Sequence, residues 1–286
     1  MSFITRFAPS PSGYLHLGHA FSAWTAWQAA QEAGGAFILR IEDIDTTRCK
    51  PEFEPDIFDD LHWLGLDWST PVRRQSEHFS DYAKMLEKLM TLGLVYRCFK
   101  TRAEILEDIA RAPHTPTNDG STPYKGPLNT LSVDEENTLL NAGKPYAWRL
   151  SLDKCRDFLG ARYEQMFFIE KNKGSIKSDP TPLGDVVLAR KDVGTSYHMA
   201  VVHDDALQGI SHVIRGMDLF EQTPVHVLLQ TLLGLPIPVY HHHRLLLDKS
   251  GKRFAKRDQA ATLQQMREGG MSAADVIALF DAEPDH

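Results

Sequence analysis

The first hundred residues alternate compact apolar runs with amphipathic stretches. Residues 3–9 and 36–43 are apolar runs typical of strands, and the Ala-rich stretch 19–35 between them has aromatic residues at helical spacing and ends in Gly-Gly. A strand, a helix and a second strand in this order predict a βαβ unit, which forms a parallel sheet covered by helices. The pattern then predicts two more amphipathic helices, over 52–68 and over 80–98, the second of which leads into a strand.

The pattern changes over the middle of the chain. Residues 111–128 are rich in Pro, Thr and Gly and predict an extended loop, and strand-like runs follow at 146–152 and 163–171. We interpret 98–184 as an insertion of mixed α+β structure. The α/β domain that it splits is expected to have two parts, 1–97 and 185–245.

The part that follows the insertion returns to strand-like runs that alternate with turns. A helix is predicted at 223–236, where an apolar stretch ends in glycine and proline, and a strand is predicted over 239–248. The remaining residues, 246–286, hold a basic loop and a stub of two short helical patterns.

Composition narrows the class of protein. The 286 residues are 42% hydrophobic, which allows a sizeable core, and no apolar run reaches the roughly 18 residues of a membrane-spanning helix. The first residues lack a basic region followed by an apolar stretch, so we expect no signal peptide. Three scattered cysteines, Cys49, Cys98 and Cys155, favour a reducing compartment over a disulfide framework. We therefore expect a cytoplasmic protein that has no membrane partner.

Charge bears on possible partners. The formal net charge of −7 argues weakly against nucleic acid, because phosphate contacts require Lys and Arg. Basic patches at 171–177 and 249–257 offset this argument, since a local patch matters more than the total charge. No coiled-coil pattern demands a partner chain, and we expect a monomer.

Residues 6–20, RFAPSPSGYLHLGHA, combine a proline-rich turn with the start of the first predicted helix. A helix N-terminus at the edge of a parallel sheet suits phosphate, because free N–H groups and the helix dipole face the ligand. Gly13 and Gly18 allow a ligand to approach the backbone closely. His16 and His19 share a helix face, where two imidazoles can stabilise charge that develops on a phosphate. A helix cap with two surface histidines is the simpler alternative.

The order of several motifs decides between these alternatives. The segment 6–20 resembles the signature of the glutamyl-tRNA synthetase family, in which HLGH stands for the HIGH motif of class I synthetases. RIEDIDTTR at 40–48, GLDW at 65–68 and the run 196–219 resemble later landmarks of that family, and 245–260 stands where its KMSKS loop belongs. The matches are dispersed and in the right order, while the insertion matches poorly.

The resemblance implies a Rossmann-like class I catalytic domain that uses ATP with Mg²⁺. The chain stops soon after the KMSKS-like loop, so we expect no anticodon-binding domain. Truncated paralogues in the family activate L-glutamate and esterify it to queuosine at the first anticodon position of tRNA(Asp). This activity is our leading hypothesis, with L-glutamate, ATP and tRNA(Asp) as partners and with RNA contacts from the insertion. A compact synthetase that charges the tRNA 3′ end, and a non-catalytic paralogue that binds glutamate or nucleotide, are the alternatives.

Glutamate carries two carboxylates and one ammonium, so its site needs two cations and one anion. Arg6 and Arg215 are the candidates for the carboxylates, because arginine binds carboxylates through two parallel hydrogen bonds. The resemblance assigns the ammonium to Glu42 and a hydroxyl contact to Tyr197, and which arginine takes which carboxylate stays open. The family lines the same pocket at two further positions, here Ala8 and Ser10. Ordinary surface ion pairs are the alternative.

The resemblance also implies the residues that bind ATP. His16 and His19 would hold ATP and stabilise its α-phosphate, with Gly18 beside them, and no acid–base residue is required. The KMSKS counterpart is RFAKR, 253–257, in which Arg253 replaces the first lysine and Lys256 is retained to bind the departing pyrophosphate. A basic surface loop is the alternative.

We expect no resident metal. Family members often carry a zinc site in the insertion, but here Lys100 stands where a cysteine would follow Cys98, and Leu128 stands where the last cysteine would follow Tyr124. The three histidines at 241–243 are adjacent on a predicted strand, so their side chains alternate between faces and do not converge. We interpret them as a solvated strand end near the nucleotide.

Overall fold

The computed structural model describes residues 2–111, 123–126, 131–246 and 261–281. Its strands are β1 (Ile4–Phe7), β2 (Ala36–Ile41), β3 (Ser69–Arg74), β4 (Val95–Cys98), β5 (Ala147–Leu150), β6 (Phe167–Glu170), β7 (Gly174–Lys177), β8 (Val187–Arg190), β9 (His212–Gly216) and β10 (Val239–His243). Its α-helices are α1 (Leu17–Glu32), α2 (Phe53–Trp63), α3 (Phe79–Thr91), α4 (Arg102–Arg111), α5 (Val133–Asn141), α6 (Leu152–Leu159), α7 (Ala161–Glu164), α8 (Tyr197–Leu207), α9 (Thr223–Leu233), α10 (Leu263–Glu268) and α11 (Ala273–Asp281). Short 3₁₀ turns are η1 (Gln75–Glu77), η2 (Thr181–Leu183) and η3 (Met217–Gln222).

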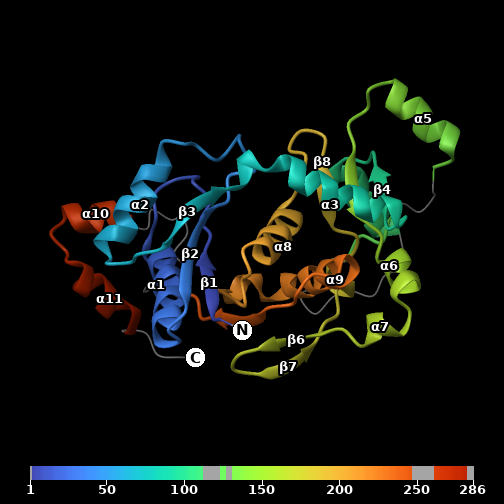
Figure 1. The fold of residues 1–286 in the computed structure, drawn as a ribbon. Helices are drawn as coiled ribbons and strands as arrows, with labels where there is room; N and C mark the ends of the chain where they lie inside the picture. The colour runs from blue at the N-terminus through green and yellow to red at the C-terminus, as the bar shows by residue number, and fades with distance from the viewer. Residues whose placement is uncertain (1, 112–122, 127–130, 247–260, 282–286) are drawn as a thin grey trace.

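The predicted βαβ unit is present at the N-terminus. Strand β1 pairs in parallel with β2, and β2 pairs in parallel with β3. Helix α1 lies against this sheet (Figure 1). It packs closely because the residues that face the sheet are small, and each of them is fully buried: Ala20, Ala23, Ala26 and Ala30.

A second group of parallel strands joins β1. Strand β10 pairs in parallel with both β9 and β6. Ser211, which precedes β9, donates its backbone N–H to Ile4 O at 3.0 Å and accepts from Ile4 N at its hydroxyl at 2.8 Å. Strands β1, β9 and β10 therefore place their carboxyl ends along one edge, where α/β proteins bind ligands.

Helix α8 corrects one prediction, because the sequence run that contains it was expected to form strands and turns. The Ser196 hydroxyl caps its N-terminus by accepting from Met199 N at 3.4 Å. The helix is buried on most of its faces, so its apolar residues form a continuous run without helical spacing, which resembles a buried strand.

The region predicted as an insertion contributes to two sheets. Strands β4, β5 and β8 form a separate antiparallel sheet at one end of the molecule (Figure 1). The hairpin β6–β7 instead joins the sheet of β9 and β10 through the pair Tyr240 and Glu170. The predicted strand at 146–152 appears as β5, whereas 163–171 begins in α7 before β6.

The last two helices pack beside α1 and α2. Leu263, Val276 and Phe280 are buried in the same core cluster as α1. Arg267 of α10 lies 3.6 Å from the buried carboxylate of Asp60 in α2. None of the helices in the described part of the chain is long and apolar enough to cross a membrane.

Candidate active site

A cavity of about 540 Å³ opens at the carboxyl edge of the parallel strands. Strands β1 and β9, the N-terminus of α1 and the start of α8 supply its walls. Within the described ranges, the cavity brings together all of the predicted glutamate and ATP residues: Arg6, Ala8, Ser10, His16, Gly18, His19, Glu42, Tyr197 and Arg215. Arg253 and Lys256 lie outside the described residues.

His16 and His19 form one unit at the start of α1. His16 is the N-cap residue, and its Nδ1 accepts from Gly18 N at 3.1 Å. His19 Nδ1 accepts in turn from His16 N at 3.2 Å, and the ring centroids lie 3.8 Å apart. Because Nδ1 accepts in both rings, each neutral imidazole carries its proton on Nε2, which can donate to a phosphate oxygen. Gly18 leaves room for the His16 ring, since an added Cβ would lie 3.1 Å from His16 Cε1, which is a tight contact.

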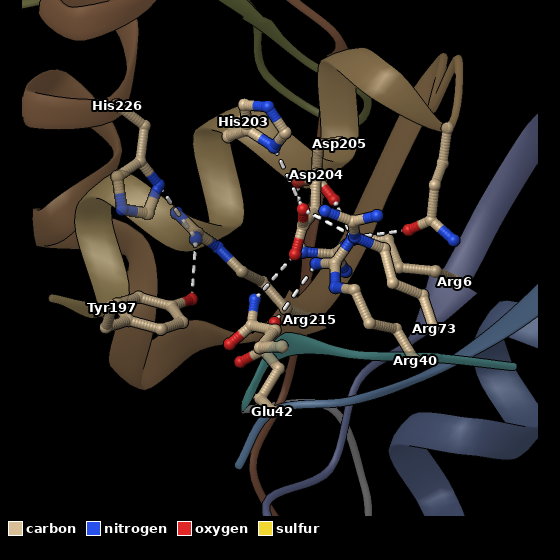
Figure 2. Close-up of polar contacts among 12 residues, drawn as sticks. Arg6, Arg40, Glu42, Arg73, Tyr197, His203, Asp204, Asp205, Arg215 and His226 are labelled. Atoms are coloured by element: carbon tan, nitrogen blue, oxygen red, sulfur yellow. Dashed lines mark hydrogen bonds and ion pairs between the residues drawn. The ribbon is translucent and has the colours of Figure 1, made fainter. Parts of the chain in front are cut away.

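Two arginines and two carboxylates form a buried charge cluster beside the cavity. Arg6 Nε donates to Asp205 Oδ1 at 3.0 Å, and Arg40 Nη1 donates to the same oxygen at 2.8 Å. Arg40 Nη2 also donates to Glu42 Oε1 at 3.0 Å. Burial alone would raise the pKa of Asp205, but the charges of Arg6 and Arg40 outweigh it and hold that pKa below its ordinary value. Asp205 thus stays ionised between the two arginines, and Figure 2 shows these contacts.

Glu42 lies at the edge of this cluster and faces the cavity. Burial raises its pKa above the ordinary value, and the charges of Arg40 and Arg6 oppose that rise. Within the described chain, its second carboxylate oxygen, Oε2, has no hydrogen-bond donor from the protein. An ammonium group placed there would find a buried anion whose other oxygen is already held by Arg40.

Asp205 and Arg40 were missed as site residues in the sequence analysis. A signal existed for Arg40, which is the charge in the apolar run AFILRI, whereas Asp205 follows His203 and Asp204 in AVVHDDAL and is less distinctive. Charged residues in such runs are rarely buried unless they are paired. The pairing itself joins positions 165 residues apart in the sequence.

Arg215 lies across the cavity from the charge cluster and is surrounded by neutral acceptors. Figure 2 shows its guanidinium between Tyr197 and His226. Nη1 donates to the Tyr197 hydroxyl at 3.3 Å and to His226 Nδ1 at 3.2 Å, and Nη2 donates to Thr223 Oγ1 at 2.7 Å. In the described part of the chain, no carboxylate forms an ion pair with this buried cation. Such a cation offers its charge to an anionic ligand.

The three adjacent histidines correct a second prediction, since they are not a solvated strand end. Strand β10 lies between β9 and β6, and His242 and His243 are buried. His243 lines the cavity, whereas His242 points to the other face and contacts Arg215 and Glu170. The expectation that their side chains alternate between faces agrees with this arrangement.

A second cavity, also about 540 Å³, adjoins the first. The two share four lining residues, namely Ser10, Ser12, Glu42 and Tyr197. Arg48 and Arg190 also line the second cavity, and both carry exposed side chains. A ligand bound at the shared wall can therefore be reached from two sides.

Among the described residues, the zinc-like positions of the insertion bring together one thiol and one tyrosine. Cys98 Sγ and the Tyr124 hydroxyl lie 3.9 Å apart, while Lys100 cannot replace a thiolate and position 128 lies outside the described residues. No cluster of three or more His, Cys, Asp or Glu side chains suited to a metal is present among the residues described. Protein groups hold this region together instead, because Asp185 accepts from the Tyr96 hydroxyl and from Leu152 N, both at 2.9 Å.

Comparison with known proteins agrees with this geometry. The family model for the catalytic domain of class I tRNA synthetases (E and Q) matches residues 2–280. A glutamyl-Q tRNA(Asp) synthetase from Rhodobacter capsulatus is 47% identical over 97% of this chain and 99% of its own length. A glutamate–tRNA ligase from Aquifex aeolicus is 38% identical over 93% of this chain but only 54% of its own length.

A solved structure gives the same picture. A glutamate tRNA ligase from Elizabethkingia meningosepticum, crystallised in complex with its amino acid, superimposes with a TM-score of 0.77 and 28% identity, covering 98% of this chain and 60% of that one. The fold described above is thus that of the class I tRNA synthetase catalytic domain (E and Q), the family to which this chain belongs. Within that class it belongs to the glutamyl-Q tRNA(Asp) synthetase family.

Proposed function

We propose that this protein activates L-glutamate with ATP and transfers the glutamyl group to queuosine in tRNA(Asp). The proposal rests on the charges that line one cavity. Arg6 and Arg215 are buried cations and Glu42 is a buried carboxylate. His16 and His19 line the same cavity. The family membership supplies the class of reaction and the identity of the acceptor.

The first step is positioning and charge stabilisation. One carboxylate oxygen of glutamate attacks the α-phosphorus of ATP, which enters as its Mg²⁺ complex, and pyrophosphate leaves as glutamyl-adenylate forms. The Nε2–H groups of His16 and His19 stabilise the negative charge that builds up on the α-phosphate oxygens. Glu42 holds the substrate ammonium, while Arg6, Arg215 and Tyr197 hold its carboxylates. Lys256 binds the departing pyrophosphate, and Arg253 supplies positive charge.

The second step uses the cavity on the other side of the shared wall. A hydroxyl of the acceptor attacks the carbonyl carbon of the adenylate, the ester bond forms, AMP leaves with the bonding electrons, and the hydroxyl proton passes to the departing phosphate. The second cavity reaches this wall through Ser10 and Tyr197, and Arg48 and Arg190 supply positive charge where an RNA backbone would lie. The antiparallel sheet and its helices offer further contacts, since Arg97, Lys100, Lys144 and Lys154 line one cavity there.

Glutamate-dependent exchange between pyrophosphate and ATP, measured without RNA, tests the first step. Exchange is expected with glutamate alone. The second step is tested with tRNA(Asp) that contains queuosine and with tRNA(Asp) that lacks it, by mapping the labelled glutamyl group after nuclease cleavage. A label in the anticodon fragment supports the proposal, whereas a label on the 3′-terminal adenosine indicates an ordinary synthetase. No exchange with or without tRNA would contradict both activities.

A further inference from the structure

The buried histidine of β10 connects Arg215 to a carboxylate from a different part of the chain. Arg215 Nε donates to His242 Nε2 at 3.0 Å. On the opposite side of the ring, His242 Nδ1 lies 2.7 Å from Glu170 Oε2, and His242 N donates to Glu170 Oε1 at 2.9 Å. Glu170 and His242 are 2% and 4% exposed, so water does not compete for these contacts.

The neighbours of His242 determine its tautomer. An arginine N–H can only donate, so Nε2 must accept from Arg215, and the Thr223 hydroxyl at 3.3 Å is placed to donate to the same nitrogen. The ring proton is therefore on Nδ1, from which it is donated to the Glu170 carboxylate. Burial, with the nearby Arg215 charge, lowers the pKa of His242 to about 3, so the ring stays neutral at physiological pH.

The other histidine that contacts Arg215 is arranged in the same sense. His226 Nδ1 accepts from Arg215 Nη1, so its proton is on Nε2 and is donated to His198 Nδ1 at 3.0 Å. Burial, followed by the charge of Arg215, lowers the pKa of both His226 and His198. Leu219 O and Thr223 complete the set, so every N–H of the guanidinium has a neutral acceptor.

We propose that Glu170 and His242 are positioning residues that orient the Arg215 guanidinium toward a carboxylate of the substrate glutamate. This inference rests on the proposed function. The carboxylate makes Nε2 a stronger acceptor through the imidazole, as outer carboxylates do for histidines that bind metals. The guanidinium plane is thereby fixed while its own charge remains without a directly bound anion. The contact to Tyr197, which is the longest and lies in the cavity, is the one that the substrate carboxylate replaces.

Glu170→Gln tests the inference with minimal change in volume. The amide oxygen can accept only one of the two His242 N–H groups, and the amide N–H₂ faces the other. If the ring changes tautomer to avoid this clash, its Nε2–H opposes Arg215 Nε–H. We expect the KM for glutamate in pyrophosphate–ATP exchange to rise about ten- to a hundred-fold, the usual effect of losing a charged hydrogen bond. The KM for ATP should stay close to the wild type, whereas the melting temperature should fall, because one buried His242 N–H loses its acceptor.

Glu87→Gln is the matched control, because it makes the same substitution on the exposed face of α3. It should leave both KM values unchanged. If Glu170→Gln folds with a wild-type KM for glutamate, or raises both KM values equally, the positioning role is wrong. If wild-type protein shows no exchange, the proposed function fails instead, and the two failures are distinguishable.

A measurement on the wild-type protein tests the positioning role of Glu170 and His242 even if Glu170→Gln does not fold. Nitrogen NMR of protein labelled in histidine, assigned from the backbone amide of His242, reports which ring nitrogen carries the proton. A neutral ring with the proton on Nδ1, and a shift of the Nε2 signal on adding glutamate, support the proposal. A proton on Nε2, a charged ring at neutral pH, or an Nε2 signal that is insensitive to glutamate would each overturn it.

Discussion

The structure predicts a severe loss of stability for Asp205→Asn. Asp205 is 5% exposed and accepts from Arg6 Nε, from Arg6 Nη2 at 3.4 Å and from Arg40 Nη1. The substitution leaves two buried guanidinium groups with Glu42 as their nearest carboxylate partner. It also turns an amide N–H₂ toward groups that can only donate.

The expected loss in free energy of unfolding follows from the burial of the charge cluster. Removing one partner of a buried ion pair costs about 3–5 kcal/mol, because the remaining charge is desolvated without compensation. A typical domain has only about 5–15 kcal/mol of free energy of unfolding. Asp205→Asn should therefore remove a large part of the stability, although Asp205 is placed behind Arg6 and does not itself act in the reaction.

Urea unfolding followed by tryptophan fluorescence measures the loss. Asp153→Asn is the control, because Asp153 is 81% exposed and lies 3.9 Å from Arg156, an arrangement expected to contribute under about 1 kcal/mol. In a double-mutant cycle with Arg40→Met, the combined loss should be smaller than the sum of the single losses. A loss for Asp205→Asn within about 1 kcal/mol of the control would refute the reasoning.

The pH dependence of stability gives an independent check on the same residue. The folded pKa of Asp205 is lowered, so its contribution is complete above the ordinary Asp pKa of about 3.9 and is lost as pH falls through the folded pKa. Wild-type protein should lose stability over that acidic range, and Asp205→Asn should lose less of it. Equal acid sensitivity in the two proteins would contradict an ionised, paired Asp205.

Three further predictions concern the reaction. His19→Ala should lower kcat for exchange about 10²- to 10³-fold with little change in the KM for glutamate, and a KM effect alone would contradict its role at phosphate. Burial raises the pKa of Glu42, so the wild-type KM for glutamate should rise as pH falls, beginning above the ordinary Glu pKa of about 4.3. Glu42→Gln should show a high KM for glutamate that does not depend on pH in this range. Treatment with a chelator, followed by return to Mg²⁺, should leave exchange and melting temperature unchanged, and one equivalent of zinc by atomic absorption would refute this.

The sequence was sufficient where local pattern decides structure. The βαβ start was predictable because β1, α1 and β2 each have a distinct period. The candidate site residues come from motifs that follow one another in order, and the described ones line one cavity. Helix α8 was missed, since burial on most faces removes the periodicity that identifies a helix. Burial of His242 could not be foreseen, because its partner Glu170 lies 72 residues earlier in the chain.

The pairing of charges in the buried cluster could not be predicted either, because its partners are far apart in the sequence. Arg6 and Asp205 are 199 residues apart, and only the parallel arrangement of β1 and β9, with α8 packed beside them, brings them into contact. Local sequence identifies such residues as unusual charges in apolar runs. It does not identify which charge neutralises which.

That long separation also affects synthesis on the ribosome. When β1, α1 and β2 have emerged, Arg6 and Arg40 lack Asp205, and the neighbouring positions in the sheet await β9 and β10. The N-terminal segment therefore cannot bury its arginines as an autonomous unit, and the nascent chain must wait for nearly all of its residues before the parallel sheet closes. The buried charge cluster therefore stays incomplete until α8 has been translated, with Glu42 as the carboxylate already available to Arg40.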